Sequence, residues 1–348
     1  MSQFMDAIVK PIAGPGLELR RVPVPEPKAG EVLIKIHKTA ICGTDVHIYN
    51  WDPWAAEHIK HPPMTIGHEY VGEIAKLGEG VTGLQVGQRV SGEGHLTCHR
   101  CRNCRSGNIQ WCKDTVSVGV DRDGAFAEYV CIPATNVILI DESIDEDVVA
   151  FFDAFGNATH TALMFPLIGE DVLITGAGPI GIIAVGICKF AGARRVIITD
   201  INDYRLGLAR NMGADVAVNT AKEDLNQIMR EQGIREGFDV GLEMSGSEIA
   251  FKQMLSVMRT GGKISLLGIG NKPFTLDMNA IIGKGLTLQG IYGRKMDNWH
   301  QMLSMVQGGL DVSPVITHRM HYTQFEEGFA AMNSGKSGKV ILDWTTRK

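Results

Sequence analysis

Short apolar runs dominate the second half of the chain. The first, Asp171–Thr175, precedes a helical stretch that ends near Phe190, and the next precedes another from about Tyr204 to Met212. Runs without polar alternation are typical of strands buried on both faces of a sheet. The runs lie at residues 171–175, 195–200, 238–243 and 263–267. Strands that alternate with helices in this way predict a parallel sheet covered on both faces.

The first half of the chain has a different pattern. Short β-type runs at 32–36, 70–74 and 126–130 are divided by Gly and Pro, which predicts a β-rich domain with long loops up to about residue 155. The C-terminal part is mixed, with a helix-like stretch around 298–307 and a final strand at 339–343. The two halves therefore differ in architecture.

Composition narrows the range of functions. With 348 residues the chain is long enough for more than one hydrophobic core. The formal net charge of -5 argues against a general nucleic-acid binder, which usually carries a basic excess. No apolar run approaches the roughly 18 residues of a membrane span, and Met1–Lys10 lacks a signal-peptide pattern. We therefore expect a cytoplasmic protein that binds neither nucleic acid nor a membrane.

Four of the seven cysteines lie close together. Their spacing is Cys98-x2-Cys101-x2-Cys104-x7-Cys112, and one tight cluster in an odd total is more typical of a metal site than of disulfides. Four thiolates can complete the tetrahedral shell of a structural zinc ion. The spacing alone also allows an iron–sulfur cluster as an alternative to zinc. A nucleic-acid-binding zinc module is disfavoured because no basic recognition helix accompanies the cysteines.

A second group of candidate ligands combines Cys42 with His68 and Glu69. Three protein ligands of these types leave a position for substrate, as a catalytic zinc requires. Thr44 and His47 follow Cys42 closely, and their hydroxyl and imidazole could pass a proton to solvent. Singly, such a cysteine or histidine is more often a packing or surface residue. Their occurrence together with the cysteine cluster and the glycine motif described next favours the metal interpretation.

A glycine-rich sequence connects the first apolar run to its helix. It reads Gly176-Ala177-Gly178-Pro179-Ile180-Gly181. Gly176 permits a tight turn, Gly178 lets the backbone approach a pyrophosphate, and Gly181 allows the helix to pack closely on the strand. Asp200 ends the next apolar run and can accept hydrogen bonds from the ribose hydroxyls of NAD. Arg205, in the following helical stretch, leaves NADP as an alternative cofactor.

The order of these motifs resembles that of one family, the zinc-containing medium-chain dehydrogenases. The resemblance covers the whole chain and rests on Cys-Gly-Thr-Asp-x-His at 42–47, Gly-His-Glu at 67–69, the cysteine cluster and Gly-x-Gly-Pro-x-Gly at 176–181. It implies an α/β protein with a β-rich GroES-like catalytic domain and a Rossmann domain built on a doubly wound parallel sheet. The catalytic domain would comprise residues 1–157 and 295–348, and the NAD-binding domain residues 158–294.

The resemblance also implies ligands and individual roles. NAD would be the cofactor, each chain would hold one catalytic and one structural zinc ion, and the protein would be a homotetramer. The catalytic zinc would be bound by Cys42, His68 and Glu69, and the structural zinc by Cys98, Cys101, Cys104 and Cys112. Thr44 and His47 would relay a proton, and Asp153 and His95 would be an acidic and a polar neighbour of the metal.

Cofactor contacts implied by the resemblance lie along the second half of the chain. Besides the glycines, they are Ile180, Asp200, Arg205, Leu267, Gly268, Ile269, Ile291 and Tyr292. Two positions depart from the family pattern, because Ala154 stands where many members have Pro and His99 where Gly is common. Neither departure removes an expected ligand.

Three stretches, 42–52, 155–161 and 198–200, resemble the members of this family that act on L-threonine. This implies oxidation of the C3 hydroxyl of L-threonine to 2-amino-3-ketobutyrate, with hydride transfer to NAD. A polyol or another secondary alcohol is the alternative substrate, because the sequence does not locate groups that hold an ammonium and a carboxylate. A non-enzymatic NAD- and zinc-binding regulator is a further alternative, although a proton relay beside an open metal would have no purpose in it.

Overall fold

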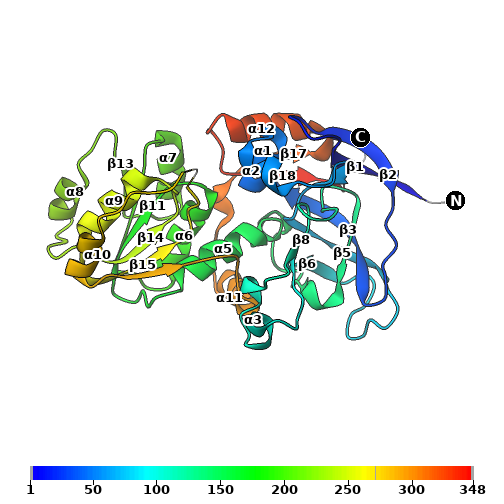
Figure 1. Ribbon diagram of the computed structural model, residues 1–348, viewed down its shortest axis with the longest axis horizontal. Coiled ribbons are helices and arrows are strands. Elements are labelled where there is room, and N and C mark those ends of the chain that lie inside the picture. The colour runs from blue at the N-terminus through cyan, green and yellow to red at the C-terminus, as the bar shows by residue number, and fades with distance from the viewer. Residues whose placement is uncertain (1–2, 271, 346–348) are drawn as a thin grey trace. The chain divides into compact units, whose positions relative to one another are not determined.

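The computed structural model describes residues 3–270 and 272–345, and the chain forms two compact units. The first unit extends to Ala154 and resumes at Ile316, and the second comprises Phe155–Val315 (Figure 1). The chain thus leaves the first unit close to the expected boundary after residue 157. It returns at Ile316, whereas the sequence predicted a return at residue 295.

Packing accounts for the late return to the first unit. Helix α11 (Met296–Gln307) buries Trp299, whose ring lies 5.3 Å from the guanidinium carbon of Arg294. Beyond this helix, Leu310 packs against Gly186 in the middle of α6 (Pro179–Phe190). The segment that the sequence assigned to the catalytic domain therefore adds to the core of the second unit.

The second unit contains a parallel six-stranded sheet in the order β13-β12-β11-β14-β15-β16. The strands are β11 (Asp171–Thr175), β12 (Arg195–Asp200), β13 (Val216–Asn219), β14 (Phe238–Glu243), β15 (Met258–Leu266) and β16 (Thr287–Gly290). This is the doubly wound Rossmann order. Every residue of β11 is buried, as a strand covered on both faces requires.

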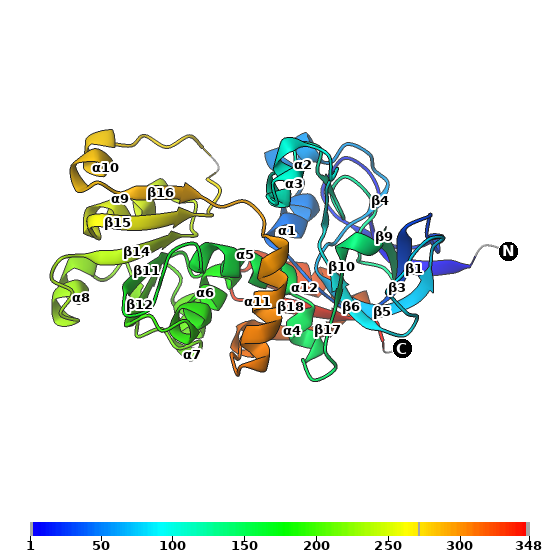
Figure 2. The same ribbon diagram turned by 90° about the horizontal axis from the view of Figure 1, so that it is seen from below.

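Helices cover both faces of this sheet. Figure 2 shows α6 and α7 (Asp203–Asn211) on one face, and α9 (Glu248–Val257) and α10 (Met278–Lys284) on the other. The remaining helices are α5 (Phe152–Ala162), which begins at the unit boundary, α8 (Leu225–Glu231) and the 3₁₀ helix η3 (Ser313–Val315). The expected α/β Rossmann unit is confirmed.

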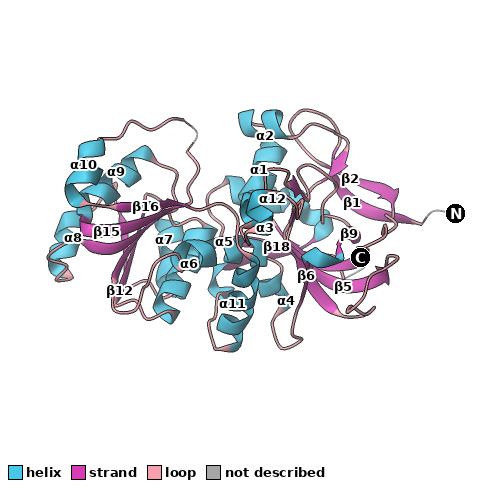
Figure 3. Cartoon of the chain, turned by 60° about the horizontal axis from the view of Figure 1, so that its bottom comes forward, coloured by secondary structure: helices cyan, strands magenta, loops and turns pink. Residues whose placement is uncertain are grey.

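The first unit is rich in strands, as Figure 3 shows. Its largest sheet has the order β10-β6-β5-β3-β18-β17, with β9 also paired to β3, and smaller sheets join β2-β1-β4 and β7-β8. The strands are β1 (Phe4–Lys10), β2 (Glu18–Pro23), β3 (Glu31–Ala40), β4 (Met64–Thr65), β5 (Tyr70–Leu77), β6 (Arg89–Gly92), β7 (His95–Leu96), β8 (Val116–Ser117), β9 (Tyr129–Pro133), β10 (Val137–Leu139), β17 (Ile316–His321) and β18 (Lys339–Asp343).

Short helices connect these strands. They are α1 (Gly43–Asn50), α2 (Pro53–His58), α3 (Arg102–Arg105), α4 (Glu146–Val149), α12 (Phe325–Asn333) and the 3₁₀ helices η1 (Ile109–Trp111), η2 (Ala134–Asn136) and η4 (Tyr322–Gln324). The strand expected at 126–130 begins only at Tyr129. Phe126 is instead fully buried against Gly67, and Ala127 makes only an isolated bridge to Ala7. Within the described residues, no helix combines the length and apolar character needed to cross a membrane.

Candidate metal and dinucleotide sites

The ends of two strands bring together the first set of candidate metal ligands. β3 and β5 pair antiparallel with Thr39 opposite Tyr70, so Cys42, two residues beyond β3, lies beside His68 and Glu69, which directly precede β5. The N–H of Ala40 donates to the carbonyl of Glu69 at 3.1 Å and fixes this register. One ligand atom each from Cys42, His68 and Glu69 lies within 4.8 Å of the others. A soft thiolate, an imidazole and a carboxylate in this arrangement fit zinc.

Buried charge surrounds these ligands. Asp45 is fully buried, accepts the Cys42 N–H at 2.9 Å, and has its other oxygen 3.6 Å from His68 Nδ1. Burial acts to lower the pKa of His68, but the negative charges of Asp45, Cys42 and Asp153 together outweigh it, and the pKa lies well above its usual range. The site thus favours positive charge at His68, which a cation on the imidazole can supply in place of a proton.

Lys339 was not anticipated from the sequence. As the first residue of β18 it reaches the same strand ends, because β18 pairs with β3 and Ile341 lies opposite Ala40. Its Nζ lies 2.5 Å from Glu69 Oε2 and 3.2 Å from the carbonyl oxygen of Ile41, and both ionic side chains are buried. Burial raises the pKa of Glu69 despite this partner. Glu69 Oε1 has no hydrogen-bond partner among the described residues, which leaves it available to a metal ion.

Helix α1 carries the predicted proton relay. Cys42 is its N-cap, and Thr44 Oγ1 lies 4.0 Å from Cys42 Sγ. His47 follows three residues after Thr44, so both side chains lie on one face of the helix. The His47 side chain is 48% exposed and contacts Asp52. The hydroxyl therefore lies beside a metal ligand, while the imidazole reaches solvent.

The other two predicted neighbours of the metal lie in the same unit. Asp153, near the start of α5, is 7% exposed, and its charge is among the influences that raise the pKa of Glu69. His95, on β7, is held by Glu93, whose Oε1 lies 2.8 Å from His95 Nδ1. Glu93 is buried and was not anticipated, since nothing in its local sequence pattern distinguishes it.

The cysteine cluster forms a separate site. Ligand atoms of Cys98, Cys101, Cys104 and Cys112 lie within 4.8 Å of one another. Backbone N–H groups point at the sulfurs: Cys98 donates to Cys112 at 3.3 Å and Cys101 donates to Cys98 at 3.4 Å. Donation from the N–H of Cys104 lowers the pKa of Cys101 to about 6. Four sulfurs with N–H donors suit a closed tetrahedral zinc shell.

The dinucleotide motif lies where β11 meets α6. Gly176 has φ of +92°, and a Cβ there would lie 2.8 Å from Ser245 Cα, while a Cβ on Gly181 would lie 2.0 Å from the Gly176 oxygen. A Cβ on Gly178 would instead enter open space. Gly178 is the N-cap of α6 and provides no side-chain cap. The first N–H groups of this twelve-residue helix are thus left for a phosphate.

The remaining predicted cofactor residues lie at the same sheet edge. Asp200, the last residue of β12, accepts the Ala177 N–H at 2.6 Å, which places its carboxylate beside the glycine turn. Ile269 is 83% and Tyr292 56% exposed, and Ile291 is buried. Ile180 and Arg205 lie in the first turns of α6 and α7, and Leu267 and Gly268 directly follow β15.

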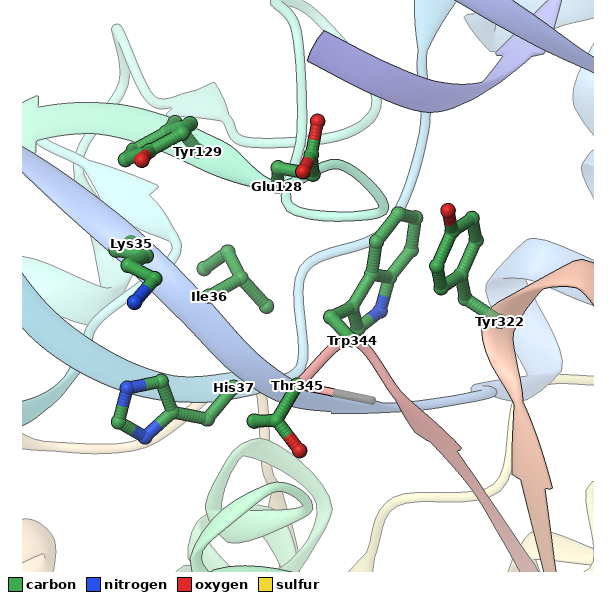
Figure 4. Close-up of a pocket in the computed structure, with 8 residues that line it drawn as sticks. All are labelled: Lys35, Ile36, His37, Glu128, Tyr129, Tyr322, Trp344 and Thr345. Carbon is green, nitrogen blue, oxygen red and sulfur yellow. The ribbon is translucent and has the colours of Figure 1, made fainter. Parts of the chain in front are cut away.

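A pocket elsewhere in the first unit contains none of the predicted site residues. Figure 4 shows Tyr322 and Trp344 along one wall and Lys35 and His37 near another. The two aromatic rings stack with centroids 4.3 Å apart, and His37 is paired with Glu146 at 2.9 Å. His37 and the Tyr322 hydroxyl thus have protein partners, and we assign the pocket no role.

Comparisons with known proteins agree with this geometry. Residues 28–142 match the family described as alcohol dehydrogenase GroES-like domain, and residues 179–308 match zinc-binding dehydrogenase. The chain belongs to the zinc-containing medium-chain dehydrogenases. The expected GroES-like and Rossmann architecture is thereby confirmed, as is the expectation of a zinc-dependent oxidoreductase. Membership of an enzyme family disfavours the alternative interpretation of the protein as a non-enzymatic NAD- and zinc-binding regulator.

Three relatives show the range of this family. An L-threonine 3-dehydrogenase of Chromobacterium violaceum is 58% identical over 341 residues, which cover 98% of this chain and all of that protein. A short chain alcohol dehydrogenase of Escherichia coli CFT073, crystallised with NADH, is 28% identical with a TM-score of 0.90 over 98% of this chain and 99% of that one. A 2R,3R-butanediol dehydrogenase of Bacillus subtilis is 25% identical with a TM-score of 0.88 over 97% and 99%.

Proposed function

We propose that this protein oxidises the C3 hydroxyl of L-threonine to 2-amino-3-ketobutyrate with NAD as hydride acceptor. The observation that carries the proposal is the near-full-length similarity to relatives named L-threonine 3-dehydrogenase. The ligand set Cys42, His68 and Glu69 supports it, because three donors leave a position at which a substrate hydroxyl can bind.

The reaction removes a hydride from C3 and a proton from the hydroxyl. Zinc bound at this site acts as a Lewis acid and makes the hydroxyl a stronger acid, much as it lowers the pKa of bound water to roughly 7. Thr44 Oγ1 then accepts the substrate proton and passes its own toward His47, which releases it to solvent. Asp45 and Lys339 hold His68 and Glu69 in place. Asp153 is a buried carboxylate in this unit and suits the substrate ammonium.

The second unit contributes the cofactor site. We propose that the N-terminus of α6 binds the pyrophosphate and that Asp200 accepts hydrogen bonds from the adenosine ribose. A carboxylate at that point repels a 2′-phosphate, so NAD should be preferred over NADP. Asp200→Ala should narrow this preference, as measured by kcat/KM with each cofactor. Comparable use of both cofactors by the unchanged protein would contradict the assignment.

A substrate panel tests the function directly. L-threonine, 2,3-butanediol and sorbitol, each with NAD and with NADP, separate the amino-acid substrate from a polyol or simple secondary alcohol. We expect the highest kcat/KM with L-threonine and NAD. Butanediol is included because a dehydrogenase of 2R,3R-butanediol shares this fold. A higher kcat/KM with a diol would replace the proposed substrate and leave the chemistry intact.

We further propose that the protein is a cytoplasmic homotetramer. The support is the family resemblance and an amino-acid substrate of central metabolism. Light scattering coupled to size exclusion should give about four times the 37.9 kDa of one chain. A mass of one chain would contradict this assembly.

A further inference from the structure

Asp52 lies in the turn between α1 and α2 and makes two separate side-chain contacts. Its Oδ1 accepts the N–H of Ala55 at 3.0 Å and so caps the N-terminus of α2. Its Oδ2 forms a short hydrogen bond with His47 Nδ1. The backbone N–H of Asp52 also donates to the carbonyl of His47 at 3.4 Å. The carboxylate is thus fixed on both sides and faces one nitrogen of the imidazole.

This contact determines which nitrogen of His47 can take up a proton. A neutral imidazole carries its hydrogen on one nitrogen and a lone pair on the other. An ionised carboxylate only accepts, so Nδ1 must carry the hydrogen and Nε2 the lone pair. Partial burial acts to raise the pKa of Asp52, but the Ala55 N–H and the His47 ring outweigh it and lower the pKa. Asp52 therefore remains an acceptor at neutral pH.

Aromatic rings restrict the orientation of His47 further. The centre of the Trp54 ring lies 5.7 Å from that of His47, with the two ring planes at 47°. The His58 ring stacks on Trp54, with the ring centres 4.5 Å apart. Lys10 lies over the neighbouring Trp51 ring, with its Nζ 4.9 Å from the ring centre. Asp52 makes the hydrogen bond to the imidazole, whereas the contacts of His58 and Lys10 are with the indole rings of Trp54 and Trp51.

We propose that Asp52 is a positioning residue for proton release: its Oδ2 holds His47 with the hydrogen on Nδ1 and Nε2 free to accept the proton from the Thr44 side. The inference rests on the proposed function, since it needs His47 to act as a relay. It goes beyond helix capping. Asp224 and Asp277 also cap helices in this chain, through Asn226 and Asn279, with no histidine partner recorded for either within the described residues.

Substitutions that keep the cap separate the two roles of Asp52. Asp52→Asn retains an oxygen for the Ala55 N–H but turns an NH2 group toward His47, which forces the hydrogen onto Nε2. Asp52→Ser retains a good N-cap and removes the partner of His47. Asp52→Ala removes both. If Asp52 only caps α2, kcat falls for Ala alone. If it positions His47, kcat falls for Asn and Ser as well, and most for Asn.

A double-mutant cycle tests whether the effect passes through His47. Zinc-loaded enzyme is assayed as wild type, Asp52→Asn, His47→Gln and the double variant, with Asp224→Asn as the matched substitution at another N-cap. We expect Asp52→Asn to lower kcat about tenfold or more, with KM and NAD affinity changed less than about twofold. Its unfolding midpoint should match that of the wild type. In the His47→Gln background the same substitution should have no further effect on kcat, and Asp224→Asn should leave kcat unchanged throughout.

Several results would overturn this proposal. They are an unchanged kcat for Asp52→Asn, an equal loss of kcat with and without His47, or an unchanged kcat for His47→Gln. The last result would also remove the relay, yet the substrate assignment would stand on the turnover of the wild type. If the wild type does not oxidise L-threonine, the cycle is measured with the best alcohol of the panel, so that failure of the substrate assignment is distinguished from failure of the positioning role.

Discussion

The two metal sites of the first unit are built in opposite ways. The cysteine cluster takes its four ligands from residues 98–112, and its backbone N–H groups donate to its own sulfurs. The Cys42 site takes its ligands from the ends of β3 and β5 and is completed by Lys339 at the start of β18. The first site is therefore local in sequence, whereas the second exists only when distant strands pair.

Their electrostatics differ as well. Three of the cluster cysteines are partly exposed, and backbone N–H groups donate to the sulfurs, where a bound zinc ion would balance the remaining charge. At the second site Asp45, Glu69 and Lys339 are all buried, and Glu69 Oε1 has no hydrogen-bond partner among the described residues. A closed shell of sulfurs braces a loop, while buried charges around an incomplete shell make a site that can accept a substrate. Substitutions at equivalent ligands should reflect this difference.

Cys42→Ser should have the largest effect. Loss of the thiolate removes a ligand of the catalytic zinc, so we expect turnover to fall by roughly a thousandfold or more. Metal analysis should show one zinc per chain fewer, and circular dichroism should show an unchanged fold. Cys131→Ser provides the control, since Cys131 is buried outside both clusters. Wild-type turnover without that zinc would mean that the metal takes no part in the chemistry.

Lys339→Met should destabilise the same site without removing a ligand. In the metal-free protein this substitution leaves the Glu69 carboxylate buried and without its counter-ion, which costs about 3–5 kcal/mol of unfolding free energy. The double variant Lys339→Met/Glu69→Gln removes both charges and should recover part of this loss. Denaturant unfolding of the two variants and of Glu69→Gln measures the coupling. Additive losses would show that the 2.5 Å pair contributes no coupling energy.

Cys104→Ser should affect stability more than chemistry. The cluster should lose its zinc, and with it the folding free energy that metal binding contributes. We expect one zinc per chain fewer, a lower unfolding midpoint, and turnover per folded, fully loaded catalytic site close to that of the wild type. An iron–sulfur absorption band in the purified protein would contradict the zinc assignment.

The same contrast explains what the sequence could reveal. The cysteine spacing and the glycine turn between β11 and α6 are local, so the residues involved could be assigned from short motifs. β11 and the C-terminal end of α6 at Phe190 agree with the predicted run and helix. Lys339 could not be paired with Glu69, because their contact requires β18 to insert beside β3. One clue was available, since a lysine that opens a buried strand needs a charged partner.

Long-range packing also accounts for the differences between the expected and the observed boundaries. The return at Ile316 rather than residue 295 follows from Trp299 and Leu310, whose apolar side chains gave no indication of which core they join. The strand expected at 126–130 loses its first part because Phe126 is needed to fill the core beside Gly67. Apolar pattern predicts burial in both cases but does not specify the partner.

Two strained backbone positions, one in each metal-site region, allow a further test of this comparison through the unfolding free energy. Each region contains one non-glycine residue in the left-handed conformation, His99 with φ of 54° in the cysteine cluster and Trp51 with φ of 55° after α1. Glycine removes the steric cost of this conformation, about 1 kcal/mol, but adds chain entropy to the unfolded state. His99 is exposed, so His99→Gly should change the unfolding free energy by less than about 1 kcal/mol, toward greater stability.

Trp51→Gly also removes the steric cost of the left-handed conformation, but it loses more side-chain packing than His99→Gly does. Trp51 packs against the core of the first unit and under the Lys10 ammonium, at 4.9 Å from its ring centre. Removing the indole should therefore destabilise the protein by roughly 2–4 kcal/mol. Both residues lie in the first unit, so the unfolding transition of that unit measures both variants. Equal losses for the two variants would mean that the cysteine loop depends on its side chains as much as the Cys42 region does, and the contrast between a locally determined site and one assembled by packing would fail.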